Sequence, residues 1–328
     1  MPLILNRKDV QSVLTMKDCI QVVEKAFAEL SNGTAALPLR NNISQKDNLP
    51  GLALYMPAYL QKLNALACKV VTVYKDNPVK YNMPTTIGKV LLQDPNTGDV
   101  ICIMDGGYLT AVRTGAASGV ANKYLAKKTP NQNVSIFGTG VQAQMQLWAM
   151  LETLDVKKVM VYDLVPESSE KFAKEMSEKH KIDIIIAENA DMLLDADVIC
   201  TATSSSTPLW DGKKLKPGTH INNIGSHSPG ARELDTETVK RSKFVGDSKE
   251  ACFNEAGDII IPLKEGAISE DHFYAELGDL VTGKKPGREN DEEITVFKSN
   301  GLAIQDVATA KLIYDKAIES GIGINVNI

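Results

Sequence analysis

A glycine-rich turn follows an apolar segment near the middle of the chain. Residues 134–137 read Val-Ser-Ile-Phe, the turn has the pattern G-x-G-x-x-A, and a helix-compatible stretch follows from 144 to 154. In such a turn the glycines permit a tight reversal and a close approach to a pyrophosphate, while the helix amides face the anion. The pattern predicts a dinucleotide-binding turn. Its expected cofactor contacts are Gly138, Thr139, Gly140, Val141 and Gln142.

Polar residues follow two other strand-like segments where a cofactor would need them. Asp163 comes 25 residues after Gly138, near the spacing at which a carboxylate binds the adenosine ribose hydroxyls. Its charge would repel a 2′-phosphate, so NAD is favoured and NADP is not fully excluded; the alternative is a solvated turn residue. Thr203 ends a later strand, where it is either a cofactor contact or a hydroxyl that caps the next segment.

Strand-like and helix-like segments alternate from residue 133 onward, which predicts a doubly wound parallel sheet of the Rossmann type and an α/β fold class. The expected strands are 134–137, 159–162, 182–186, 198–202, 220–224 and 244–246.

The first part of the chain shows a different pattern. A capping-box-like start at Thr15 precedes a helical pattern that stops at 31–33, and strands at 52–56, 67–73, 89–92 and 100–104, with a turn at 94–99, predict a mixed sheet. A last helical pattern follows Gly301. We therefore expect an α+β substrate-binding and dimerisation domain over 1–120 and 303–328, a Rossmann domain over 121–302, and linkers near 115–130 and 295–305.

Composition narrows the class of partner and the compartment. A formal charge of −5 gives no general electrostatic reason to bind nucleic acid. The five cysteines are scattered in apolar surroundings, which indicates reduced thiols, and neither they nor the four histidines have the spacing of a metal site. No apolar stretch reaches about 18 residues. We expect a small-molecule partner, no metal, no membrane association and a cytosolic location.

Taken together, the motifs resemble the ornithine cyclodeaminase/mu-crystallin family over nearly the full length of the chain. The segments that carry the resemblance are 37–40 (LPLR), 67–71 (ACKVV), 83–86 (MPTT), 104–105 (MD), 112–116 (VRTGA), 138–142 (GTGVQ), 224–225 (IG) and 301–306 (GLAIQD). The resemblance implies a homodimer built through the first domain, a substrate handled by Arg40, Lys69 and Arg113, cofactor contacts from Thr85 and Arg113, and Asp306 close to the nicotinamide ribose.

The residue types suit a substrate that carries a carboxylate. Arg40 could clamp it through two parallel hydrogen bonds, although Arg40 and Arg113 would equally suit structural ion pairs. Lys69 lies within an apolar run, where desolvation would lower its pKa and suit it to proton transfer or to polarising a C=N or C=O group. A surface-facing lysine is the alternative.

Two departures from the family pattern bear on the reaction. The resemblance implies that members which cyclise ornithine carry acidic residues where this chain has Leu54 and His227. Without them, the second ammonium of ornithine is poorly matched. His227 is either a catalytic imidazole or a turn-capping residue.

We therefore expect an NAD(P)-dependent oxidoreductase that reduces Δ1-pyrroline-2-carboxylate or Δ1-piperideine-2-carboxylate to proline or pipecolate, or a related amino-acid dehydrogenase such as alanine dehydrogenase. An ornithine cyclodeaminase and a crystallin-like small-ligand-binding protein are the alternatives.

Overall fold

The computed structural model describes residues 1–38, 41–44 and 48–327, and the chain forms two compact units. The first comprises Met1–Arg113 and Leu302–Ile328, and the second comprises Thr114–Gly301. The chain passes from the first unit to the second within helix α4 (Gly106–Leu125), and it returns after Gly301. These boundaries lie at 113/114 and 301/302, compared with the 120/121 and 302/303 expected from the sequence. None of the described helices is long and apolar enough to cross a lipid bilayer.

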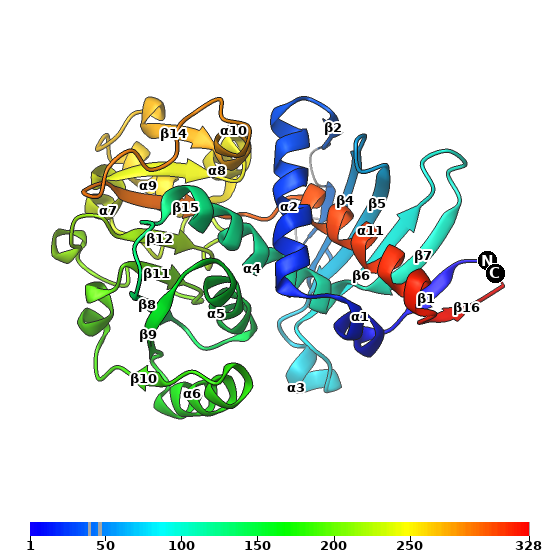
Figure 1. The fold of residues 1–328 in the computed structure, drawn as a ribbon, viewed down its shortest axis with the longest axis horizontal. Coiled ribbons are helices and arrows are strands. Elements are labelled where there is room, and N and C mark those ends of the chain that lie inside the picture. Colours follow the sequence, from blue (N-terminus) through cyan, green and yellow to red (C-terminus); the bar gives the residue numbers. More distant parts are fainter. Residues whose placement is uncertain (39–40, 45–47, 328) are drawn as a thin grey trace. The chain divides into compact units, whose positions relative to one another are not determined.

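The first unit is a mixed eight-stranded sheet with helices packed on it (Figure 1). Its strand order is β16-β1-β7-β6-β5-β4-β2, with β3 also paired to β4. Helix α11 packs on β4, β5 and β6 and against α2. The elements are β1 (Leu3–Leu5), α1 (Arg7–Val13), α2 (Met16–Ser31), β2 (Ala35–Ala36), β3 (Asn41–Ile43), β4 (Leu52–Leu60), β5 (Ala65–Val73), α3 (Asn77–Tyr81), β6 (Thr86–Gln93), β7 (Val100–Asp105), α11 (Ala303–Ser320) and β16 (Ile324–Asn325). The predicted mixed sheet and the helices at both ends of the chain are confirmed.

Side chains on the two faces of this sheet differ in burial. Directly paired residues project from the same face, so the strand registers define continuous rows. One row is buried throughout and consists of Met56, Lys69, Val90, Met104 and Leu5. A second row on the opposite face is half-buried and consists of Pro57, Cys68, Leu91, Ile103 and Ile4. The first face is therefore covered, whereas the second leaves apolar side chains partly open to solvent.

The second unit is an eight-stranded sheet in which every pairing is parallel. Its strand order is β10-β9-β8-β11-β12-β15-β13-β14. The elements are β8 (Gln132–Phe137), α5 (Val141–Thr153), β9 (Val156–Tyr162), α6 (Pro166–His180), β10 (Ile184–Ile186), η2 (Ala190–Asp195), β11 (Val198–Thr201), η3 (Gly212–Lys214), β12 (His220–Asn223), α7 (Thr236–Arg241), β13 (Ser242–Gly246), α8 (Lys249–Glu255), α9 (Gly257–Lys264), η4 (Glu270–His272), β14 (Phe273–Glu276), α10 (Leu277–Val281) and β15 (Ile294–Lys298).

This order places the topological switch of a doubly wound sheet between β8 and β11, where ligands bind outside the carboxyl ends of the strands. All six predicted strands of this unit are present. Strands β14 and β15 were not predicted, and the expectation of a linker over 295–305 was wrong for its first part. Ile294–Lys298 is a fully buried strand between β12 and β13, because tertiary pairing places it inside the sheet.

A buried histidine makes the second unit sensitive to acid. His220 is fully buried and its Nδ1 lies 2.9 Å from Thr295 Oγ1. The Thr295 hydroxyl donates its single hydrogen to the Leu125 carbonyl. It can therefore only accept from His220, which means that Nδ1 of the imidazole is the donor. Burial, followed by the nearby charge of Arg288, lowers the pKa of His220 from 6.5 to about 3. The folded protein therefore holds a neutral imidazole at a pH where the unfolded chain is protonated.

We predict that the stability contributed by His220 is fully present above pH 6.5 and is lost as the pH falls toward 3. Between pH 6.5 and 5 the free energy of unfolding should fall by about 1.7 kcal/mol through this group alone. Urea unfolding of the native protein and of His220→Gln at both pH values measures it. Equal pH dependence in the two proteins would contradict the prediction.

Candidate functional site

Three buried charged side chains meet in the first unit. Lys69 on β5, Arg113 on α4 and Asp306 on α11 are 2%, 5% and 0% exposed. Lys69 Nζ lies 2.7 Å from Asp306 Oδ2, and Arg113 Nε donates to Asp306 Oδ1 at 2.9 Å. Arg113 also donates through Nη1 to Gln305 Oε1. The structure thus brings together three residues that the sequence singled out from separate segments.

The fold accounts for the burial of this cluster. Lys69 belongs to the covered row of the sheet, between Met56 and Val90 on the neighbouring strands. Helix α11 packs across these strands and carries Asp306 in its first turn, where the helix dipole favours a negative charge. The apolar run around Lys69 left a surface-facing lysine open as the alternative, and the structure shows that Lys69 is buried.

Two buried cations contact one carboxylate in this cluster. A buried cation is stabilised by a nearby anion, so an ammonium and a guanidinium placed together suit a ligand that carries a carboxylate.

The sequence also singled out Arg40 as a substrate contact, Leu54 as a departure from the family pattern and Thr85 as a cofactor contact. Arg40 lies outside the described residues. Leu54 pairs with Val71 beside the Met56–Lys69 pair, so it projects from the same face as Lys69 and is its diagonal neighbour. Thr85 is half-buried in this unit, and its carbonyl accepts from Tyr74 N.

The glycine-rich turn of the second unit has the conformation that a dinucleotide requires. Gly138 has a φ of +92°, and a Cβ there would come within 2.6 Å of the Ala202 carbonyl oxygen. Gly140 precedes α5, and a Cβ there would meet nothing within 4 Å. The N-cap residue Gly140 makes no side-chain bond to the first turn of α5, which leaves amides there for an anion, and Ala143 is fully buried. The turn therefore fits a pyrophosphate.

Asp163 and Thr203 adjoin this turn. Asp163 follows β9; it accepts from Thr139 Oγ1 at 2.8 Å and from Val165 N at 3.0 Å. These bonds hold the carboxylate beside the turn, as a ribose contact requires. Thr203 follows β11, and its Cγ2 lies 3.3 Å from a Cβ built at Gly138.

His227 is exposed and follows β12 in the second unit, within the range expected for the Rossmann domain.

Two hydrogen-bond partners in the described residues, Gln305 and Glu233, were not predicted. Glu233 is completely buried and accepts from both Thr203 N and Thr203 Oγ1. Such contacts depend on tertiary structure and leave no local pattern in the sequence.

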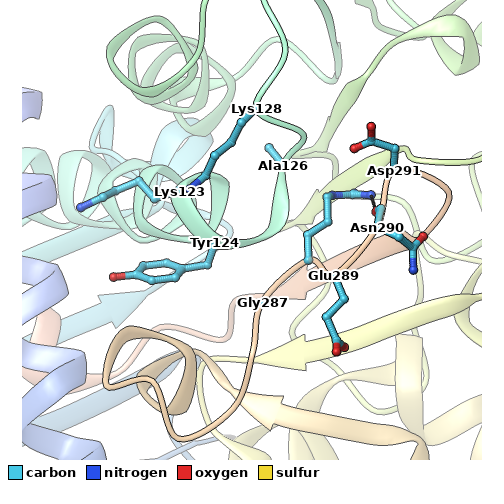
Figure 2. Close-up of a pocket in the computed structure, with 9 residues that line it drawn as sticks. Lys123, Tyr124, Ala126, Lys128, Gly287, Glu289, Asn290 and Asp291 are labelled. Atoms are coloured by element: carbon cyan, nitrogen blue, oxygen red, sulfur yellow. Dashed lines mark hydrogen bonds between the residues drawn. The ribbon is translucent and has the colours of Figure 1, made fainter.

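The second unit also contains a pocket of about 360 Å³ whose lining does not include the glycine-rich turn; Figure 2 shows residues that line it. Its lining comes from the segments that precede β8 and β15, at the amino ends of these strands. Arg288 in its wall donates to the carbonyls of Leu125 and Glu293, which indicates a structural role. The lining residues are Lys123, Tyr124, Ala126, Lys128, Gly287, Arg288, Glu289, Asn290 and Asp291.

Comparisons with known proteins agree with this geometry. The family model "Ornithine cyclodeaminase/mu-crystallin family" matches residues 1–321. The solved Δ1-pyrroline-2-carboxylate reductase of Thermococcus litoralis, in complex with NADH and L-proline, is 50% identical with a TM-score of 0.94, covering 99% of this chain and 100% of that chain. A curated Δ1-pyrroline-2-carboxylate reductase of Bacillus thuringiensis subsp. konkukian is 39% identical over 98% of both chains.

A third relative has a different activity. A solved archaeal alanine dehydrogenase dimer with bound NAD is 35% identical with a TM-score of 0.93, covering 99% of both chains. The fold, the glycine-rich turn and these matches lead to one assignment: the chain belongs to the ornithine cyclodeaminase/mu-crystallin family.

Proposed function

We propose that this protein is an NADH-dependent reductase that converts Δ1-pyrroline-2-carboxylate to proline and accepts the six-membered Δ1-piperideine-2-carboxylate as a homologous substrate. The observation that carries the proposal is the buried cluster of Lys69, Arg113 and Asp306, in which two cations contact one carboxylate. A cyclic imino acid brings one carboxylate and one imine nitrogen. Its carboxylate would pair with the guanidinium of Arg113, and the Lys69 side chain would face the imine nitrogen.

The dinucleotide would be held by the turn from Gly138 to Gln142, with Asp163 on the adenosine ribose and Thr203 beside the turn. The family resemblance implies further cofactor contacts from Thr85, Arg113 and Asp306. When bound, NADH supplies the hydride that reduces the imine carbon. The carboxylate of Asp163 favours NADH over NADPH, because a 2′-phosphate would meet like charge.

This chain's own residues would bind and orient the substrate and supply the proton that the imine nitrogen takes up. Arg113, together with Arg40, would anchor the substrate carboxylate. The Lys69 ammonium would donate a proton to the imine nitrogen, or hold a water that does so, and Asp306 would stabilise the ammonium beforehand. Preorganised charge near the reacting atoms is commonly the largest contribution to catalysis. His227 remains a candidate for a secondary catalytic role.

Alanine dehydrogenase is the second candidate, because a full-length relative at 35% identity has that activity. In that case the same cations would anchor the carboxylate of a linear substrate. An ornithine cyclodeaminase is less well supported, since Leu54 places an apolar side chain diagonal to Lys69 where a carboxylate would be needed for a second ammonium. A crystallin-like binding role would not require a buried amine.

The decisive experiment follows NADH absorbance with the purified protein and each candidate substrate. Δ1-pyrroline-2-carboxylate and Δ1-piperideine-2-carboxylate are compared with pyruvate plus ammonia and with ornithine, using NADH and NADPH. We expect stoichiometric NADH oxidation with the cyclic imines. Faster turnover of pyruvate plus ammonia would favour alanine dehydrogenase, and proline formed from ornithine without net NADH change would favour the cyclodeaminase. NADH binding without any turnover would favour the binding protein.

We further propose that the protein is a homodimer, formed through the open face of the first unit's sheet. The row of Pro57, Cys68, Leu91, Ile103 and Ile4 is apolar and half-buried, and the Lys89–Asp105 ion pair at 3.7 Å lies beside it. A continuous apolar face with polar groups beside it is typical of an interface. The archaeal relative that was solved as a dimer supports the dimeric state. A cytosolic location remains a prediction.

Leu91→Glu tests the dimer. A charge placed in the middle of the apolar row should shift the protein from dimer to folded monomer at micromolar concentration, because the interface would bury it without a partner. Sedimentation velocity measures the mass, and far-UV circular dichroism checks the fold. Lys171→Glu on α6, an exposed charge change in the second unit, is the matched control and should stay dimeric. A dimeric Leu91→Glu protein would rule out this face.

A further inference from the structure

A completely buried carboxylate joins the ends of two strands in the second unit, and the proposed reaction does not use it. Glu233 is 0% exposed. Its Oε1 accepts from Thr203 N at 2.8 Å and from Thr203 Oγ1 at 2.7 Å. Its Oε2 accepts from Gly225 N at 2.8 Å and from Thr201 Oγ1 at 2.7 Å, with Asn223 Nδ2 at 3.1 Å.

These donors come from the carboxyl ends of two neighbouring strands. Thr201 ends β11 and Thr203 follows it, whereas Asn223 ends β12 and Gly225 follows that strand. A Cβ at Gly225 would lie 2.3 Å from the Thr203 carbonyl oxygen and 2.4 Å from Glu233 Oε1. The two segments are therefore packed together around the carboxylate without room for a larger side chain.

The segment that follows β11 packs directly against the dinucleotide turn, and we call this segment the wall of the turn. A Cβ built at Gly138 would lie 2.6 Å from the Ala202 carbonyl oxygen and 3.3 Å from Thr203 Cγ2. Displacement of the peptide between Ala202 and Thr203 would therefore move that wall. Glu233 fixes this peptide directly, through the bond from Thr203 N.

A second layer of buried charge fixes Glu233 itself. Asp258 Oδ1 accepts from the backbone N–H groups of Glu233 and Leu234 at 2.8 and 2.9 Å. Lys298 Nζ lies 3.1 Å from Asp258 Oδ2 and donates to the Ser226 carbonyl at 2.6 Å. Desolvation raises the pKa of Glu233, while the charge of Lys298 and the hydrogen-bond donors act in the opposite direction.

We infer that Glu233 is a positioning residue for cofactor binding: its two oxygens hold the segments after β11 and β12 in the conformation that receives the dinucleotide. The inference rests on the proposed function, because it assumes that NADH binds at the turn of Gly138. It predicts an effect on the affinity for NADH that a role in folding alone would not produce.

Glu233→Gln is the test. Glutamine keeps the shape but has only one acceptor oxygen, so either Thr203 N or Gly225 N loses its partner. Loss of one charge-assisted hydrogen bond corresponds to an increase in the Kd for NADH of about 10- to 100-fold. Because the chemical step is untouched, kcat at saturating NADH should change by less than about threefold. Kd is measured by NADH fluorescence titration, and Tm is measured alongside.

Glu29→Gln is the matched control. Glu29 is a buried carboxylate of the first unit whose two oxygens accept separately from Lys62 N and Leu63 N, both at 2.8 Å. The same chemical change there should lower the Tm comparably and leave the Kd for NADH unchanged. Equal Kd values for Glu233→Gln and the native protein would overturn the inference. A native protein that fails to bind NADH would overturn the proposed function instead.

A second variant keeps the test available if Glu233→Gln does not fold. Thr201→Val is close to isosteric and removes the hydroxyl that donates to Glu233 Oε2. The backbone donors remain, so the Kd for NADH should rise by only about threefold to tenfold. An unchanged Kd in this folded variant would count against the inference.

Discussion

Lys69→Ala is expected to lower kcat for imine reduction by about 100- to 10,000-fold, which is the usual contribution of a positioned proton donor. The Kd for NADH should change by less than about threefold, because the dinucleotide turn lies in the other unit and does not include Lys69. Steady-state kinetics with Δ1-pyrroline-2-carboxylate and fluorescence titration with NADH provide the two measurements.

Two further variants separate chemistry from structure. Lys69→Arg keeps the positive charge beside Asp306 but does not release a proton near neutral pH, so it should fold and remain strongly impaired. Lys311→Ala removes a half-buried lysine of α11 that pairs with Asp315 and should leave activity unchanged. If Lys69→Ala lost NADH binding together with turnover, Lys69 would have a structural role and the proposed mechanism would be wrong.

Asp306→Asn is expected to destabilise the protein by about 3–5 kcal/mol, the usual cost of removing one partner from a buried ion pair. The substitution leaves the cations of Lys69 and Arg113 buried side by side without the carboxylate that both contact. Activity should fall as well, because neither cation keeps its orientation. Urea unfolding at neutral pH measures the free energy.

The control for this prediction lies on the same helix. Asp315→Asn removes the carboxylate of the Lys311–Asp315 pair, in which the aspartate side chain is 46% exposed. Surface pairs contribute little, so the free energy of unfolding should change by no more than about 1 kcal/mol. If Asp306→Asn caused an equally small change, the central electrostatic argument for the substrate site would be incorrect.

Some features could be predicted from the sequence because their causes are local. The turn from Gly138 to Gln142 is contiguous, and its glycines report a backbone conformation directly. The apolar run around Lys69 indicated a strand, and the family resemblance, not the run alone, favoured a role for Lys69 inside the site. The family motifs marked Arg113 and Asp306 separately.

Other features were decided only by the tertiary structure. Sequence placed Lys69 in an apolar run but did not show that Asp306 would meet its amine; packing of α11 on the sheet brings the two together. Strand β15 was mistaken for a linker because its place between β12 and β13 depends on pairing with distant segments. No local sequence pattern marks Glu233, although its carboxylate accepts hydrogen bonds from residues at the ends of two strands. Local patterns determine elements and turns, whereas a buried charge finds its partners only when those elements pack.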